Sequence, residues 1–222
     1  MPDLRPGVLF DVDGTLLDTN YLHVLAWWQA FRDAGHEPVA MDRIHRAIGI
    51  PSEGLVEHLL GKADDDAVEA HSSRYEPLRE HVEPYPRTAE LLHACTERGL
   101  TVVLATSGRA ADLDWMQPAI GAEDAVAGAT TSEDVDEGKP EPDLLTTAMR
   151  DHGLDPERTV AVGDTVWDVE AARKAGIPCI GLTCGGIGAA ELTEAGADAI
   201  YDDPADLLEH LGDALLGRVA AG

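Results

Sequence analysis

The hydrophobic pattern divides the chain into two parts: one short apolar run followed only by helical repeats, and then, beyond Pro86, an alternation of apolar runs and helical repeats. Residues 7–10 (GVLF) are apolar and lead into DVDGT, which predicts a buried strand followed by a loop. From 21 to 34 the apolar residues recur at helical spacing. Further helices are predicted at 41–48, 53–61 and 64–81. No strand-like run occurs between residues 18 and 85.

Beyond Pro86, strands and helices alternate. The runs that predict strands are 101–106, 125–131, 159–164, 177–183 and 197–201. The helices expected around them are 87–98, 142–152, a helix through Ala175, and 204–216. This alternation predicts an α/β fold, a Rossmann-like doubly wound parallel sheet with helices on both faces. We expect residues 1–17 and 86–222 to form this core and 18–85 an inserted all-helical domain.

Composition narrows the class of protein. The chain has 222 residues, of which 44% are hydrophobic and 26% charged, as in ordinary globular proteins. No apolar run approaches the roughly 20 residues that cross a bilayer. No basic segment with a cleavage site precedes the first strand, so a cytoplasmic protein is expected. Three cysteines without a metal-ligand spacing predict reduced, structural thiols; they are Cys95, Cys179 and Cys184.

The charge balance restricts the partners. Sixteen Lys and Arg residues against 42 Asp and Glu give a formal net charge of -26, which repels nucleic acid and anionic membranes. A small molecule is therefore the expected partner. If that molecule is an anion, its site must supply a local positive field. The lysines available for this are few, namely Lys62, Lys139 and Lys174.

Polar residues follow the predicted strands, where open sheets bind their ligands. Asp11 and Asp13 stand one residue apart in a tight turn, a costly pair unless a cation or unequal protonation relieves it. Capping aspartates in a plain loop are the simpler interpretation. A calcium-binding EF-hand loop does not fit, because Leu16 and Leu22 occupy its required Gly and Glu positions.

Three further segments have the same placement. Thr106 and Ser107 begin a turn that could bind an anion or merely cap a helix. Lys139 is held between a glycine and a proline just before a helix. Asp164 and Asp168, spaced i and i+4, offer hard oxygen ligands for Mg²⁺ or serve only as N-terminal helix residues.

Taken together, DxDGT, the strand-end Thr106-Ser107, the Gly-Lys139-Pro segment and GDTxxD resemble the four motifs of the haloacid dehalogenase superfamily. The match spans the whole predicted core. The helical insert resembles the type-1 cap of that superfamily, as in members similar to phosphoglycolate phosphatase and β-phosphoglucomutase. The resemblance implies a Mg²⁺-dependent phosphatase acting on a small phosphorylated metabolite.

The resemblance also implies roles for individual residues. Asp11 would be the nucleophile that forms an aspartyl-phosphate, and Asp13 the general acid and base. Thr106, Ser107 and Lys139 would hold the phosphoryl oxygens. Those expected to bind Mg²⁺ are Asp11, Asp13 through its backbone carbonyl, Asp164, and Asp168 as a ligand or as an orienting residue.

Two alternatives are open. A sugar phosphomutase similar to β-phosphoglucomutase is suggested by DTNYLHVLAW (18–27), which carries His23 and Trp27 in matching places. A catalytically silent ligand-binding relative is disfavoured by the intact aspartates and Lys139. Substrate contacts are predicted from His23, Arg46 and Ser52, while the remaining cap histidines are interpreted as surface or structural residues. We expect a monomer or a homodimer.

Overall fold

The computed structural model describes residues 4–212 and 215–221. Within them, six strands form one parallel sheet in the order β3-β2-β1-β4-β5-β6. The strands are β1 (Arg5–Phe10), β2 (Thr101–Ala105), β3 (Val126–Thr130), β4 (Leu154–Gly163), β5 (Cys179–Leu182) and β6 (Ala199–Tyr201). The predicted α/β fold is confirmed, and every strand predicted from an apolar run is present.

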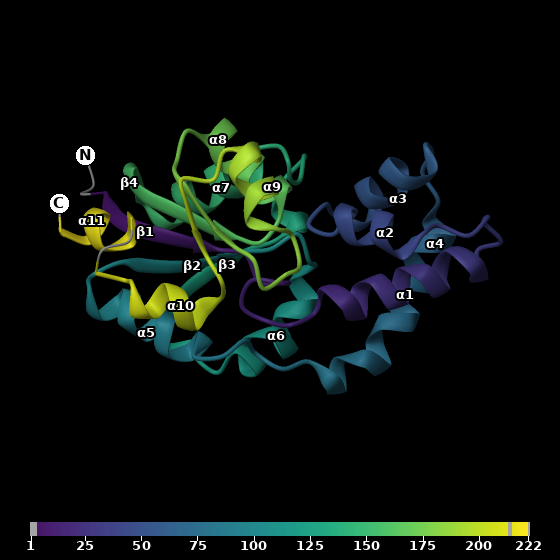
Figure 1. Ribbon diagram of the computed structural model, residues 1–222, viewed down its shortest axis with the longest axis horizontal. Coiled ribbons are helices and arrows are strands. Elements are labelled where there is room, and N and C mark those ends of the chain that lie inside the picture. Colours follow the sequence, from purple (N-terminus) through teal and green to yellow (C-terminus); the bar gives the residue numbers. More distant parts are fainter. Residues whose placement is uncertain (1–3, 213–214, 222) are drawn as a thin grey trace.

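Helices cover both faces of the sheet, because neighbouring residues of each strand point to opposite sides. Val8 and Phe10 of β1 pack into one apolar cluster, and Leu9 between them packs into the other. The helices of the first cluster are α5 (Thr88–Glu97), α6 (Leu113–Ile120), α10 (Pro204–Glu209) and α11 (Leu215–Ala221). Those of the second are α7 (Asp143–His152), α8 (Val166–Ala175) and α9 (Ala189–Ala195). Figure 1 shows α7, α8 and α9 above the strands and α5, α6 and α10 below them.

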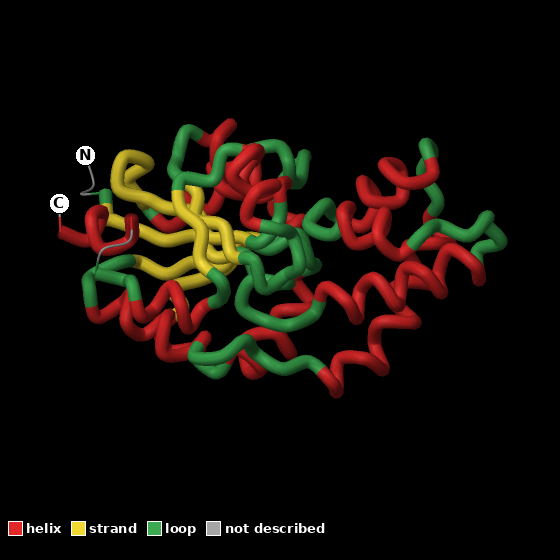
Figure 2. The backbone as a smooth tube through the Cα atoms, in the orientation of Figure 1, coloured by secondary structure: helices red, strands yellow, loops and turns green. Residues whose placement is uncertain are grey.

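The helices between β1 and β2 lie together beyond one end of the sheet, as Figures 1 and 2 show. They are α1 (Asn20–Asp33), α2 (Met41–Ala47), α3 (Ser52–Leu60), α4 (Asp65–Tyr75) and the 3-10 helix η1 (Glu76–His81). Trp27, Phe31, Ile44 and Leu55 are buried in an apolar cluster of their own. The chain enters and leaves this helical region side by side, since Leu17 forms an isolated bridge with Pro84. No strand lies between residues 18 and 85.

The helix predictions need three corrections. The helix predicted over 64–81 changes to 3-10 geometry at Glu76, and the closing helix predicted over 204–216 ends at Glu209. A new helix begins at Leu215, and residues 213 and 214 lie outside the described part of the chain. Helices α6 and α9 were not predicted, because they are short and α6 contains an internal proline, Pro118. No described helix is long and apolar enough to cross a membrane.

Candidate active site

The ends of three adjacent strands bring polar residues together at one edge of the sheet. Asp11 directly follows the last residue of β1. Thr106 stands in the same place after β2, and Asp164 after β4. Strand β1 lies between the other two and pairs with both in parallel. All three residues are buried, with Thr106 and Asp164 fully so. The sheet topology therefore gathers residues that are about 150 positions apart along the sequence.

Lys139 is buried between two carboxylates. Its Nζ lies 2.5 Å from Asp11 Oδ1 and 2.7 Å from Asp168 Oδ1, and it donates to the Ala105 carbonyl at 3.1 Å. Burial alone would lower the pKa of Lys139, but Asp11 and Asp168 raise it above its usual value. The side chain is therefore a permanent ammonium that neutralises and orients Asp11.

Both carboxylate oxygens of Asp168 contact other residues of the protein. Oδ1 faces Lys139, while Oδ2 accepts hydrogen bonds from the Thr165 backbone N–H at 3.1 Å and from its hydroxyl at 2.5 Å. This arrangement is a capping box at the start of α8. Of the two roles expected for Asp168, its contacts favour that of a residue that positions Lys139.

Asp164 is held by neutral donors. Its Oδ1 accepts from the Thr15 hydroxyl at 3.1 Å, and its Oδ2 accepts from the Asn20 amide at 2.7 Å. The same Asn20 amide donates to the Gly185 carbonyl at 3.0 Å. Burial, reinforced by the nearby charges of Asp168 and Asp11, raises the pKa of Asp164 well above its usual value. The carboxylate is thus fixed in place but has no ion-pair partner among the residues that the structure describes.

The carboxylates of this edge are short of positive charge. One oxygen each of Asp11, Asp164 and Asp168 lies within 4.8 Å of the others. Burial raises the pKa of Asp11 to about 7, although Lys139 lowers it. Three buried carboxylates beside one ammonium are two positive charges short of balance, and their hard oxygens suit Mg²⁺. The residues present therefore fit a divalent cation.

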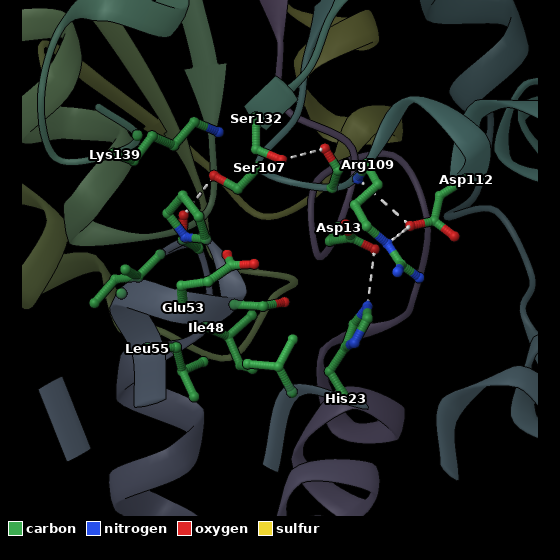
Figure 3. Close-up of a pocket in the computed structure, with 18 of the residues that line it drawn as sticks. Asp13, His23, Ile48, Glu53, Leu55, Ser107, Arg109, Asp112, Ser132 and Lys139 are labelled. Carbon is green, nitrogen blue, oxygen red and sulfur yellow. Dashed lines mark hydrogen bonds and ion pairs between the residues drawn. The ribbon is translucent and has the colours of Figure 1, made fainter. Parts of the chain in front are cut away.

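Asp13 lies on the side of the site that faces the helical region. Its Oδ1 accepts from the Thr19 hydroxyl at 2.7 Å and lies 3.3 Å from His23 Nε2. Figure 3 shows the His23 ring directed at this carboxylate. Burial opposes ionisation of Asp13, but hydrogen bonds from His23 and Thr19 hold its pKa below the usual value. Asp11 and Asp13 therefore occupy opposite electrostatic settings.

Among the remaining cap histidines, which are predicted to be mainly surface or structural residues, His71 is buried and contacts a residue of the site. His71 Nε2 lies 3.2 Å from Nδ1 of His23, and the ring stacks on Trp27 at 3.9 Å. The His23 ring stacks in turn on Tyr75, with ring centres 3.8 Å apart. Burial, together with the His23 charge, lowers the pKa of His71 well below its usual value, so the ring is neutral. The contacts arise between α1 and α4, so sequence spacing within one helix could not reveal them.

A cavity of about 800 Å³ lies between these helices and the sheet edge. Asp11, Asp13 and Lys139 line it on the core side, and His23 and Ser52 line it on the helical side. Its size falls within the range of about 300–1,000 Å³ typical of small-molecule sites. The cavity thus opens directly onto the two aspartates.

Two predicted phosphate-binding residues have other partners in the structure. The Thr106 hydroxyl is fully buried and accepts a hydrogen bond from the Gly108 N–H at 2.9 Å. The Ser107 hydroxyl donates to the Gly49 carbonyl at 2.7 Å and so ties the sheet edge to the loop between α2 and α3. Ser107 lines the cavity together with Lys139 and Asp11.

Arg46 is not brought to this cavity. Its guanidinium forms an exposed ion pair with Glu191 of α9, and its backbone carbonyl accepts from the Trp167 indole at 2.9 Å. Arg46 therefore joins the helical region to the core at a separate contact. The site residues that sequence patterns did not reveal are Asn20, His71, Tyr75, Arg79 and Arg109.

Comparison with known proteins agrees with this arrangement. A model of the haloacid dehalogenase-like hydrolase family matches residues 8–182. The chain belongs to this family. The matched range contains every motif residue from Asp11 to Asp168, the whole helical region and the strands from β1 to β5 except the first residues of β1.

Individual relatives of this hydrolase family cover nearly the full chain. The sequence is 27% identical to the phosphoglycolate phosphatase of Agrobacterium fabrum, over 98% of this chain and 97% of that protein. It is 31% identical to the N-acetylmuramic acid 6-phosphate phosphatase of Pseudomonas aeruginosa, over 94% and 96%. A hydrolase from Pseudomonas syringae of known crystal structure superposes with a TM-score of 0.88 at 34% identity, covering 94% of this chain and 99% of that one.

Proposed function

We propose that this protein is a phosphomonoester hydrolase that acts on a small phosphorylated metabolite through a covalent intermediate on Asp11. The observation that carries the proposal is the pair of aspartates at the end of β1, one joined to Lys139 and the other to His23. The phosphatase names of the Agrobacterium and Pseudomonas relatives support the same reaction.

The two aspartates divide the chemistry between them. Asp11, oriented by Lys139, attacks phosphorus in line and forms an aspartyl-phosphate while the ester oxygen leaves. Asp13 gives a proton to that oxygen and later takes one from the water that hydrolyses the intermediate. The dianionic substrate raises the pKa of Asp13 when it binds, which favours the protonated acid. Lys139 offsets charge on the transferring group.

Mg²⁺ fits the carboxylate edge of the sheet. Asp11, Asp164 and the Asp13 backbone carbonyl would hold the ion, with Asp168 orienting Lys139 beside them. When bound, the ion supplies positive charge to the phosphoryl oxygens. Asp164 serves this site best when ionised, and the Thr15 and Asn20 donors hold it in position for that.

Residues 18–85 are proposed to act as a cap domain that closes over the substrate. The cap contributes His23 and Ser52 to the cavity, and its loop carbonyl at Gly49 accepts from Ser107 of the core. A closed cap excludes water from the aspartyl-phosphate until the leaving group has departed. Its chain entry and exit at Leu17 and Pro84 adjoin, as a hinge requires.

The mutase alternative keeps one supporting contact, that of His23 with Asp13. Lys62, which is the cap's single lysine, is exposed beside Asp64 and does not line the cavity. Relatives that match nearly the whole chain are named phosphatases, so hydrolysis is the better-supported reaction.

Phosphate release tests the proposal. The purified protein with Mg²⁺ should release phosphate from p-nitrophenyl phosphate and from members of a sugar-phosphate panel, and a chelator should stop the release. Asp11→Asn should retain the fold by circular dichroism but lose turnover. Near-normal turnover by this variant contradicts the proposal. Glucose 1,6-bisphosphate giving isomerised sugar without free phosphate would favour the mutase instead.

A further inference from the structure

Two buried polar atoms at the cap wall of the cavity lack a hydrogen-bond partner among the described residues. They are the Tyr75 hydroxyl and Arg79 Nε. Both residues line the cavity, and Tyr75 is only 3% exposed. A buried donor without a partner is costly, so such groups in a cavity wall point to a missing acceptor. Neither atom takes part in the mechanism proposed above.

Positive charge accompanies these two donors. Arg79 Nη2 lies 2.6 Å from Asp112 Oδ1, and Arg109 Nε lies 3.7 Å from Asp112 Oδ2. One carboxylate thus faces two guanidinium groups, which leaves one positive charge in excess. We call Tyr75, Arg79, Arg109 and Asp112 the arginine corner. In a chain of net charge -26, and in a cavity whose other charged lining residues are mostly acidic, this cluster is a distinct local feature.

The arginine corner is held in place by aromatic rings. The Arg79 guanidinium carbon lies 5.8 Å from the centre of the Tyr75 ring and 5.3 Å from that of Trp115. The Trp115 indole also donates to Asp112 at 3.3 Å. Burial, reinforced by Asp13, raises the pKa of Tyr75, so its hydroxyl keeps its proton. The unpartnered groups are therefore fixed donors that require an acceptor.

The arginine corner lies on the side where the leaving group must emerge. His23 lies 3.3 Å from Asp13 and stacks on Tyr75, so a single ring separates the proposed acid from the corner. In Figure 3, Arg109 and Asp112 lie on the side of Asp13 and His23, away from Lys139. The cavity of about 800 Å³ can hold a sugar-sized group between the two ends.

We propose that the arginine corner binds a second anionic group, a carboxylate or a phosphate, at the far end of the substrate's leaving group. The inference rests on the proposed phosphatase function and names its substrate class as sugar-sized phosphomonoesters with a distal anion. Arg79 and Tyr75 donate to that anion, and Arg109 adds charge at the open side of the cavity. The unpartnered donors gain the acceptor that they lack in the free protein.

Matched substrate pairs test the inference. N-acetylmuramic acid 6-phosphate differs from N-acetylglucosamine 6-phosphate by a carboxylate-bearing ether, and fructose 1,6-bisphosphate differs from fructose 6-phosphate by a phosphate. The wild type should prefer the anion-bearing member of at least one pair about tenfold or more in kcat/KM. The pair that shows the preference identifies the anion as carboxylate or phosphate.

Variants assign the preference to the corner. Arg79→Gln should remove it by raising KM for the anion-bearing member alone, and Tyr75→Phe should weaken it while keeping the ring that stacks on His23. Arg74→Gln is the matched control, because Arg74 of α4 pairs at the surface with Asp33 of α1 and does not line the cavity. It should leave the kinetics of all four substrates unchanged.

Equal kcat/KM for both members of each pair overturns the inference, as does an Arg79→Gln effect of equal size on both. A different result would contradict the proposed phosphatase function itself. In that case the wild type releases no phosphate from p-nitrophenyl phosphate, or Asp11→Asn releases it as well as the wild type does. A phosphatase without anion preference would thus contradict the arginine corner alone.

Discussion

The two walls of the cavity differ in how their residues are held. On the core wall, Asp11 follows a strand and Lys139 precedes a helix, and a direct ion pair joins the two side chains. Asp164 lies behind them and is held by hydrogen bonds from Thr15 and Asn20. On the cap wall, His23 and Tyr75 come from different helices and meet only through ring stacking. The core wall concentrates charge, whereas the cap wall arranges aromatic rings and donors.

This difference separates two tasks. The core wall must stabilise charge on a phosphoryl group, which every phosphomonoester shares, so its residues form one compact ionic set. The cap wall must fit the remainder of the substrate, which varies, so its residues depend on how helices pack. Changes to the core wall should therefore abolish turnover, while changes to the cap wall should alter which substrate is used and how tightly.

The largest effect is expected from Lys139→Met. Removing the ammonium leaves the buried Asp11 and Asp168 carboxylates facing each other, which should cost about 3–5 kcal/mol of stability. Loss of the charge beside the transferring group should lower kcat at least about a hundredfold. Urea unfolding and phosphate release measure the two effects.

Lys174→Met is the matched control for this change. Lys174 forms a comparable ion pair with Glu141 at 2.6 Å, but both side chains are partly exposed. Such surface pairs are worth about 1 kcal/mol or less, so stability and kcat should hardly change. If Lys139→Met behaved like Lys174→Met, the distinction between a charge-bearing core wall and the rest of the molecule would fail.

An intermediate effect is expected when the pH is changed with and without Mg²⁺, and it is measured as a change in the stability of the folded protein. The pKa of Asp11 lies at about 7, above its ordinary value of 3.8, so the metal-free folded site loses stability as pH rises between these values. A divalent cation binds the ionised carboxylates and relieves that loss. Below about pH 7, Mg²⁺ must displace protons from the carboxylates that bind it. For each proton displaced, the apparent Mg²⁺ affinity should fall about tenfold for every unit by which the pH is lowered.

Thermal unfolding with and without Mg²⁺ measures this linkage. The rise in Tm on adding Mg²⁺ should be larger at pH 7.5 than at pH 5.5. Comparing Tm with and without Mg²⁺ at the same pH removes the contribution of titrating groups that do not contact the ion. An equal rise at both pH values would show that Asp11 and Asp164 do not take up the ion by releasing protons.

The smallest effect is expected from Gly49→Ala in the cap loop. Gly49 has φ +101, and a Cβ there would lie 2.8 Å from Thr165 Oγ1 of the core. The closed cap should become less favourable by about 1–2 kcal/mol, which raises KM about tenfold and leaves kcat nearly unchanged. Steady-state kinetics with p-nitrophenyl phosphate measure this.

Gly61→Ala separates cap closure from backbone strain. Gly61 has φ +73 at the end of α3, and a Cβ there would contact nothing within 4 Å. This variant should lose similar stability but keep its KM. A similar rise in KM for both variants would mean that strain alone, and not contact between cap and core, sets the affinity.

The sequence predicts the core wall well because parallel strands place their carboxyl ends together. Because Asp11, Thr106 and Asp164 each follow a strand of a parallel sheet, the fold itself brings the three residues together. The pairing of Lys139 with Asp168 did not follow, because the loop carrying Lys139 has no regular structure that fixes its path.

The cap wall could be predicted only in part. His23 stood out in a recognisable segment, but its contact with His71 depends on how α1 packs against α4. Arg46, three residues before Gly49 of the cavity loop, is predicted at the substrate and instead pairs with Glu191. Helical periodicity tells which residues share a face, but the partner of that face is decided by tertiary packing.

The covalent step on Asp11 is the central claim, and chemical trapping tests it most directly. The protein would be mixed with substrate and Mg²⁺, quenched after milliseconds, treated with borohydride and digested for peptide mass analysis. Borohydride reduces an acyl phosphate but spares a free carboxylate, so the account predicts homoserine at position 11 in the substrate-treated sample only. Unmodified Asp11 during rapid turnover, or reduction at another aspartate, would contradict it.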